Sequence, residues 1–174
     1  MIRIATKADI PHVAATYCEL LTYEQEHGTH SNWVLDVYPT EETAETAFQK
    51  NYLYVLEEEG TICGSVILNQ LQPEEYTAGT WHYEATPEQV LVIHTLCIPP
   101  SQAGKGYGRR LVQYAITVAQ ERKLPVIRLD TWAGNKPAAT LYQNMGFLPA
   151  GGAHVLLQGL IPEEQIFFDR AITW

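Results

Sequence analysis

The residue types best suited to chemistry gather in one glycine-rich stretch, which runs from Pro99 to Arg110. Glycines stand at positions 104, 106 and 108, and one lysine and two arginines add positive charge. An apolar run at 90–98 precedes the stretch and a helical apolar repeat follows it, which predicts a strand, a tight turn and a helix N-terminus. Backbone N–H groups at a helix N-terminus lack internal partners, and glycines let a ligand approach them closely. The stretch therefore indicates a site for phosphate or pyrophosphate.

Two common nucleotide motifs fail in this stretch. The dinucleotide fingerprint G-x-G-x-x-G would need a glycine where Arg109 stands. The P-loop needs Ser or Thr directly after Gly-Lys, but Gly106 follows Lys105. A plain strand-to-helix turn is the remaining alternative, and three alternating glycines exceed what such a turn requires.

The rest of the chain supplies the elements that must position this stretch. Apolar periodicity and turn residues predict a single domain over residues 1–174, of mixed α/β class, with a parallel strand pair on either side of one helix. Polar and aromatic residues mark two long loops. Strands are expected at 2–4, 52–56, 62–68, 90–98, 126–131, 147–148, 155–157 and 165–172, helices at 9–24, 43–49, 107–123 and after Asn135, and loops at 25–40 and 69–88.

A second signature follows the glycine stretch and runs N-x-x-A-x-x-L-Y-x-x-x-G-F from Asn135 to Phe147. Together with Ala103-Gly104-Lys105-Gly106-Tyr107-Gly108, it resembles the Gcn5-related N-acetyltransferase (GNAT) superfamily, whose loop pattern is R/Q-x-x-G-x-G/A. The resemblance implies a central, mostly antiparallel sheet flanked by helices, in which the parallel strands at 90–98 and 126–131 splay apart. One residue departs from the pattern, because Ala103 replaces the usual Arg or Gln and Gln102 lies one position early.

The resemblance implies acetyl-CoA as co-substrate and direct transfer of its acetyl group, in a ternary complex, to a primary amine of a small molecule or peptide. It implies that a backbone N–H of Leu96, Cys97 or Ile98 polarises the thioester carbonyl. It also implies cofactor contacts from Asn135 and Tyr142. The remaining implied cofactor contacts are Gln102, Ala103, Gly104, Lys105, Gly106, Tyr107, Gly108 and Arg109.

Two side chains are the candidates for proton transfer. Tyr142 stands where the family carries a general acid, and a phenol with a pKa near 10 suits donation to a departing thiolate; the alternative is an inward aromatic of the core. His94 could take a proton from the amine through water, because an imidazole with a pKa near 6.5 is a base at neutral pH; the alternative is a structural histidine. Asp130 is interpreted as structural, and Cys97 as a packing residue rather than a nucleophile.

Charge is unevenly distributed along the chain. The formal net charge is −9, with −12 on residues 1–100 and +3 on residues 101–174. An acidic protein is a poor candidate for nucleic acid, whereas the basic part suits the phosphates of coenzyme A. Aromatic residues and carboxylates of the two long loops suit a cationic amine as acceptor. The acidic run Glu57–Glu59 is expected to form a solvated turn.

Scattered cysteines and histidines, three and six in number, predict neither a disulfide framework nor a metal site. The first residues lack the features of a signal peptide, and no apolar run reaches the about 18–20 residues of a membrane span. A cytoplasmic protein without membrane partners is therefore expected, as a monomer or a homodimer. The alternative function is a non-catalytic acyl-CoA sensor of the same fold, and a dinucleotide enzyme is a remote third.

Overall fold

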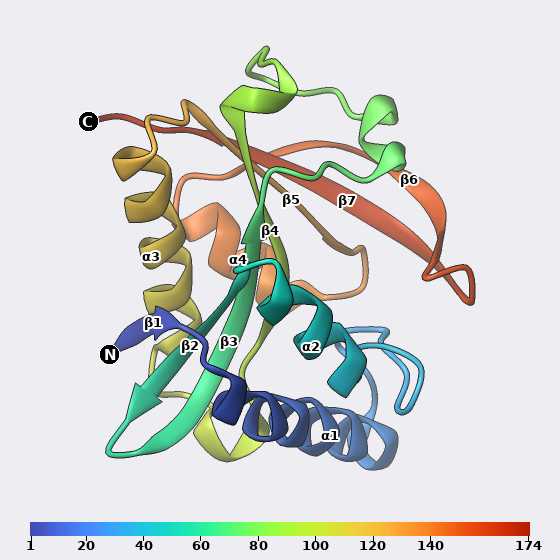
Figure 1. The fold of residues 1–174 in the computed structure, drawn as a ribbon. Helices are drawn as coiled ribbons and strands as arrows, with labels where there is room; N and C mark the ends of the chain where they lie inside the picture. Colours follow the sequence, from blue (N-terminus) through green and yellow to red (C-terminus); the bar gives the residue numbers. More distant parts are fainter. The chain divides into compact units, whose positions relative to one another are not determined.

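The computed structural model describes the chain from Met1 to Trp174, with seven strands and four α-helices (Figure 1). Hydrogen-bonded strands follow the order β1-β2-β3-β4-β5-β7-β6. Strands β4 and β5 are parallel, whereas β1–β2, β2–β3, β5–β7 and β6–β7 are antiparallel, which confirms the predicted mixed sheet. The elements are β1 Ile2–Ile4, α1 Ile10–His27, α2 Glu41–Gln49, β2 Leu53–Glu58, β3 Thr61–Asn69, β4 Val90–Cys97, α3 Tyr107–Glu121, β5 Val126–Trp132, α4 Lys136–Asn144, β6 Leu148–Leu157 and β7 Ile161–Ala171.

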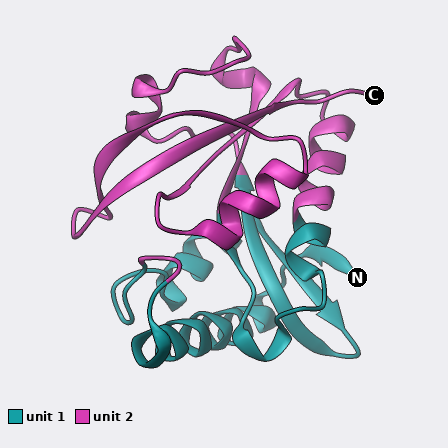
Figure 2. Ribbon diagram, turned by 180° about the vertical axis from the view of Figure 1, so that it is seen from behind, with its two compact units in different colours: residues 1–29, 33–68, 95–111 teal, residues 30–32, 69–94, 112–174 magenta.

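The chain divides into two compact units, which Figure 2 distinguishes by colour. Unit 1 holds residues 1–29, 33–68 and 95–111, and unit 2 holds residues 30–32, 69–94 and 112–174. Neither unit is continuous in sequence, since strand β4 begins in unit 2 and ends in unit 1. A single folding domain over residues 1–174 stays a prediction.

Unit 1 is built around one apolar face of α1. Ile10, Val13, Tyr17 and Leu21 recur at spacings of three or four residues, and none is more than 2% exposed. Three of them share a core with residues of α2, β2 and β3. The buried members of that core are Ala5, Ile10, Val13, Tyr17, Ala44, Ala47, Leu53, Val55, Ile67 and Cys97.

Unit 2 contains the parallel strand pair. The ladder pairs Val90–Ile93 of β4 with Val126–Leu129 of β5, and no pair is registered beyond Ile93 and Leu129. Strand β5 nevertheless continues to Trp132. The last residues of β5 therefore have no parallel partner, which agrees with the expected splay. A core of valines and aromatic residues lies on one face, namely Tyr76, Val90, Val92, Val126, Ala150 and Phe167.

Thr95 of β4 has φ 47°, a left-handed conformation that β-branched residues rarely adopt. Its hydroxyl forms a short hydrogen bond with the hydroxyl of Tyr38, and both residues belong to unit 1. A left-handed residue breaks the regular pleat of a strand, so ladder pairing cannot continue unchanged through this position. The sequence run at 90–98 predicted an uninterrupted strand and did not indicate this break.

The structure moves several predicted boundaries. Helix α1 extends to His27, and the strands expected at 147–148 and 155–157 form one strand, β6. Pairing of β6 with the long strand β7 continues past a register shift between Pro149 and Gly152. None of the helices is both long and apolar enough to cross a membrane.

Candidate active site

The glycine stretch of unit 1 presents a row of free backbone donors. Gly104 and Gly106 have φ 76° and 77°, a left-handed conformation that glycine adopts without strain. Helix α3 begins at Tyr107, and its first hydrogen bond runs from the Arg110 N–H to the Gly106 carbonyl at 3.1 Å. The N–H groups from Gly104 to Arg109 thus have no backbone acceptor. They lie at the positive end of the helix dipole, where phosphate oxygens bind.

Two donors of the predicted set are used within the protein. The Gln102 N–H donates to the Pro99 carbonyl at 2.9 Å, and the Ala103 N–H donates to the Pro100 carbonyl at 3.1 Å. These bonds close a short 3₁₀ turn over Pro100–Gln102. The donors available to a ligand therefore begin at Gly104, two residues later than the sequence indicated.

The three basic side chains of the stretch differ in the contacts that they make within the protein. Arg110 Nη2 lies 2.8 Å from Glu58 Oε1, and its guanidinium stands 5.6 Å from the ring centre of Tyr107. Lys105 Nζ donates to Gln102 Oε1 at 2.9 Å. Arg109 is exposed and makes no ion pair or side-chain hydrogen bond. Arg109 is therefore the guanidinium that a ligand can engage without displacing a partner.

The end of β4 supplies a buried thiol and two half-buried aliphatic neighbours. Cys97 is 1% exposed, and its Sγ lies 3.9 Å from the Thr16 carbonyl. Burial raises the pKa of the Cys97 thiol to about 12, so it is protonated at neutral pH and a poor nucleophile. This confirms the packing role predicted for Cys97. Leu96 lies beside it in β4, and Ile98 follows the strand.

Helix α4 of unit 2 is held at both ends by hydrogen bonds that the sequence predicted. Asn135 caps its start, where Oδ1 accepts the Ala138 N–H at 3.1 Å. Gly146, with φ 87°, ends it in the left-handed conformation. The Phe147 N–H then donates back to the Tyr142 carbonyl at 3.0 Å. The backbone of Tyr142 is fixed by this terminal turn.

The Tyr142 ring is buried, and its hydroxyl is unpartnered. The residue is 7% exposed, and its ring centre lies 5.8 Å from that of Phe147 and 6.0 Å from that of Phe168. The hydroxyl has no hydrogen-bond partner within the protein and is not among the fully enclosed polar atoms. Burial first, and the charge of Asp130 second, raise the pKa of Tyr142. The phenol is therefore protonated at neutral pH with its O–H free to donate.

The hydrogen bonds around His94 define its tautomer. Nε2 of His94 lies 2.8 Å from Asn69 Oδ1, which also accepts the Leu71 N–H at 3.0 Å. Because the Leu71 N–H can only donate, it identifies the Asn69 atom as oxygen, so Nε2 of His94 must donate to it. Nδ1 then carries the lone pair of the neutral ring. Burial lowers the pKa of His94 to about 4, and a hydrogen bond from the imidazole to the Leu71 backbone opposes this shift.

Asp130 has a more specific environment than the structural role expected for it. Tyr76 Oη donates to Asp130 Oδ2 at 2.6 Å, and Oδ1 has no partner within the protein. Burial raises the pKa of Asp130 to about 6; the nearby acidic residues add to this rise and the Tyr76 hydrogen bond opposes it. The sequence contained a hint of this environment, because Arg128 and Asp130 are charged residues that alternate with the apolar residues of β5.

Comparison with known proteins assigns this chain to a family. The sequence matches the acetyltransferase (GNAT) family over residues 18–147. The chain belongs to this family. A streptothricin acetyltransferase from Escherichia coli is 30% identical over 118 residues, which are 68% of this chain and 63% of that protein.

Solved structures agree with the GNAT assignment at the level of the fold. A GNAT-family acetyltransferase from Streptococcus agalactiae matches with a TM-score of 0.82 at 20% identity, covering 100% of this chain and 96% of that one. A YncA structure from Salmonella typhimurium, solved with its cofactor acetyl-CoA, matches with a TM-score of 0.70 at 18% identity, covering 99% and 94%. The chain therefore has the fold that its two motifs imply for this family, and it spans less than two thirds of the length of the Escherichia coli relative.

The aromatic residues of the loop after β3 were predicted to suit a cationic amine acceptor. Two of them, Tyr76 and Trp81, pack in the core of unit 2. Tyr76 is 3% exposed and Trp81 stacks on Phe167 with ring centres 5.4 Å apart. The Arg128 guanidinium lies 4.3 Å from the ring centre of Trp81 and donates to the Tyr83 carbonyl at 3.0 Å. These contacts hold the loop against β5, so Tyr76 and Trp81 are packing residues of unit 2.

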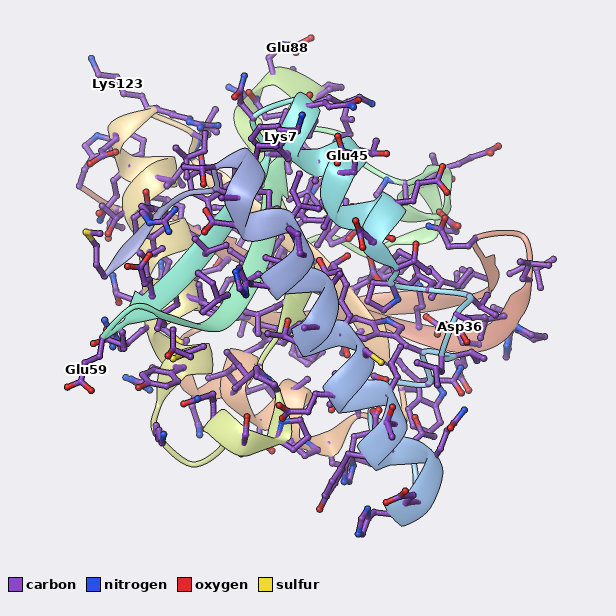
Figure 3. All side chains as sticks on the ribbon, turned by 60° about the horizontal axis from the view of Figure 1, so that its bottom comes forward. Lys7, Asp36, Glu45, Glu59, Glu88 and Lys123 are labelled. Atoms are coloured by element: carbon purple, nitrogen blue, oxygen red, sulfur yellow. The ribbon has the colours of Figure 1, made fainter.

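The acidic run after β2 is only partly a solvated turn. Glu59 is exposed at the tip of the hairpin, where Figure 3 shows its side chain projecting outward. Glu57 forms an ion pair with Arg3, and Glu58 forms one with Arg110. No group of three or more His, Cys, Asp or Glu side chains lies close enough together to hold a metal ion.

We expect His94 to stay neutral down to about pH 4, with the proton of the neutral ring on Nε2. Because the unfolded chain takes up this proton nearer pH 6.5, the contribution of His94 makes the free energy of unfolding fall as the pH decreases from about 6.5 to 4. NMR of ¹⁵N-labelled histidine measures both the titration and the tautomer, with the signal of exposed His12 as internal reference. A titration midpoint at or above 6.5, or a proton on Nδ1, would contradict the expectation.

Proposed function

We propose that this GNAT acetyltransferase transfers the acetyl group of acetyl-CoA directly to a primary amine of a small molecule or peptide, in a ternary complex. The observation that carries the proposal is the row of free N–H groups from Gly104 to Arg109 at the start of α3. Such a row suits the several oxygens of a pyrophosphate. A Cβ built at Gly104 or Gly106 would meet no atom within 4 Å, so the approach to the backbone there is open.

Positive charge and one free amide support the same cofactor. Arg109 has no protein partner, and Lys105 holds only the neutral amide oxygen of Gln102. Both cations can therefore serve the phosphates in addition to the helix dipole. Asn135 uses its Oδ1 for the helix cap, which leaves its Nδ2 hydrogens for a further contact with the cofactor. The donors of Gly104–Arg109 do not depend on the position-103 side chain, so the departure at Ala103 leaves this cradle intact.

The acetyl carbonyl needs a donor and the thiolate needs a proton. We assign the first role to a backbone N–H of Leu96, Cys97 or Ile98, and the inert Cys97 thiol supports direct transfer over an acetyl-enzyme. We assign the second role to Tyr142, because its ring is fixed by packing and its hydroxyl is protonated and unpartnered. A core aromatic would need no free hydroxyl, and this contrast favours the catalytic role over the packing role.

The acceptor must lose protons as the amide forms, since an alkylammonium has a pKa near 10.4. His94 supports this step with the lone pair of Nδ1, which is present across the neutral pH range. Its pKa of about 4 makes it a weak base, better suited to orienting the amine or a bridging water than to keeping the proton. Carboxylates of unit 2, including Asp130 and Glu163, favour a cationic acceptor.

The first test is thiol release from acetyl-CoA with a panel of amines. We expect release well above solvent hydrolysis with cationic primary amines, and weaker release with neutral or anionic amines of similar size. The panel should include streptothricin, because the Escherichia coli relative is a streptothricin acetyltransferase. Mass spectrometry of the product should show one added acetyl group on nitrogen. Binding of acetyl-CoA without thiol release across the panel would favour the acyl-CoA sensor instead.

We expect Tyr142→Phe to lower kcat at least about tenfold, because the thiolate then leaves without a proton donor. Acetyl-CoA affinity should stay within about twofold, since the ring and its packing are retained. Steady-state kinetics and calorimetry separate the two effects. Tyr23→Phe, at a residue 45% exposed in α1, is the matched control. Unchanged turnover in Tyr142→Phe would remove this residue from the acid role.

We expect Arg109→Gln to raise the Kd for acetyl-CoA about fivefold at low salt, and less at high salt, because a charge-assisted contact to phosphate is lost. Arg110→Gln is the matched control: it removes the same charge from the next residue, but that guanidinium already pairs with Glu58. Its Kd should change about twofold or less. Equal changes in Kd for the two variants would show that Arg109 acts only through the overall positive charge of the glycine-rich stretch, without a direct contact to phosphate.

A further inference from the structure

We infer that Asp130 is a further catalytic residue, whose free Oδ1 accepts a proton from the acceptor amine, with Tyr76 as the residue that positions its carboxylate. The inference rests on the proposed function and names the proton acceptor in that reaction. It follows from the register of the parallel strands, from the hydrogen bonds of one carboxylate and from the lack of an ion pair to that carboxylate.

The register places Asp130 at the first open position of the sheet. Val92 pairs with Arg128 and Ile93 with Leu129, and the ladder ends there. Asp130 is the next residue of β5, and His94 is the next residue of β4. Side chains alternate along a strand, so both lie on the face that carries Val92 and Arg128. His94 of β4 and Asp130 of β5, which can both exchange protons, thus follow the end of the ladder on its two strands.

The hydrogen bonds of Asp130 leave one oxygen for a ligand. Oδ2 accepts the Tyr76 hydroxyl at 2.6 Å, while Oδ1 accepts nothing from the protein. Tyr76 is itself held at 3% exposure, with its ring centre 5.1 Å from that of Phe167. The carboxylate is therefore fixed in orientation by a rigid donor and presents its second oxygen outward.

No ion pair balances the charge of this half-buried carboxylate. The ionisable groups that act on Asp130 are Glu75 and Tyr76 after β3, Glu163 of β7 and Tyr142 of α4. Arg128, two residues earlier in β5, donates instead to Gln72 Oε1 and to the Tyr83 carbonyl. Glu163 accepts hydrogen bonds from Gln165 at 2.8 Å and from Asn32 at 3.3 Å, and burial raises its pKa as well. An incoming ammonium is the partner that these carboxylates lack.

The proton affinity of Asp130 fits a base that works at neutral pH. Burial and the neighbouring carboxylates raise its pKa to about 6, so it is ionised at pH 7 and still basic enough to accept a proton. His94, with a pKa of about 4, is a weaker base by roughly two pKa units. Asp130 thus takes the proton, while the Nδ1 lone pair of His94 can accept a hydrogen bond from the amine.

The protons and bonds of the step balance. The ammonium nitrogen loses two protons as its bond to the acetyl carbon forms and the bond from that carbon to sulfur breaks. One proton passes to Asp130 Oδ1 and then to solvent. The second proton passes to solvent. Tyr142 gives its own proton to the thiolate and then recovers one from solvent, so these two transfers cancel. The products are the amide, the free thiol of coenzyme A and one released proton.

The deciding variant is Asp130→Asn, which keeps an oxygen for the Tyr76 hydroxyl but cannot accept the proton. We expect kcat to fall about 100-fold and the activity limb near pH 6 to disappear, while the Kd for acetyl-CoA changes less than about twofold. Asp130→Glu should recover part of kcat. A rise in KM with kcat unchanged, or an unaltered pH profile, would overturn the assignment and leave the proposed function standing. Wild-type protein that releases no thiol with any amine would overturn both.

Two variants that keep Asp130 test the role even if Asp130→Asn misfolds. Tyr76→Phe removes a hydrogen bond that lowers the pKa of Asp130, so the acidic limb should move to higher pH. Glu163→Gln removes a neighbouring carboxylate that raises this pKa, so the limb should move to lower pH. Opposite shifts support Asp130 as the titrating base. Shifts in the same direction, or none, would assign the limb to another group.

Discussion

The end of the parallel ladder between β4 and β5 is the constraint on which the candidate site depends. Four residue pairs join the strands, and the last is Ile93 with Leu129. Two residues later, Thr95 adopts a left-handed backbone that a regular ladder cannot accommodate. The side chains of His94 and Asp130 therefore border an opening in the sheet instead of a closed strand pair. An opening of this kind exposes backbone and side-chain polar groups to a ligand without a loop having to move.

Unpaired polar groups are the second feature that the structure retains. The N–H groups of Gly104–Arg109 and the Oδ1 of Asp130 have no hydrogen-bond partner within the protein, and they lie at a helix start and at a strand end respectively. They have opposite polarity, since the first attracts phosphate and the second attracts an ammonium.

Rigid packing supports each proposed catalytic group. Tyr142 is fixed by the terminal turn of α4 and by two phenylalanine rings, and Asp130 is fixed by Tyr76. Tyr76 in turn belongs to an aromatic core with Trp81 and Phe167. The loop after β3 thus works as a structural brace for β5 and not as a set of freely exposed aromatic walls. Groups held in this way need little reorganisation when a substrate arrives.

The sequence by itself determined the fold class, the glycine loop, the cap at Asn135 and the stop at Gly146. These features follow from local rules: apolar periodicity, the φ freedom of glycine and the hydrogen bonds that helix ends require. Only the tertiary structure decided which loop donors stay free, that Arg110 is paired and Arg109 is not, and that His94 is a weak base while Asp130 is a stronger one. Those properties depend on burial and on partners far away in the sequence, such as Glu58 for Arg110 and Tyr76 for Asp130. A residue's type states which protons it can carry, but its surroundings set the pH at which it carries them.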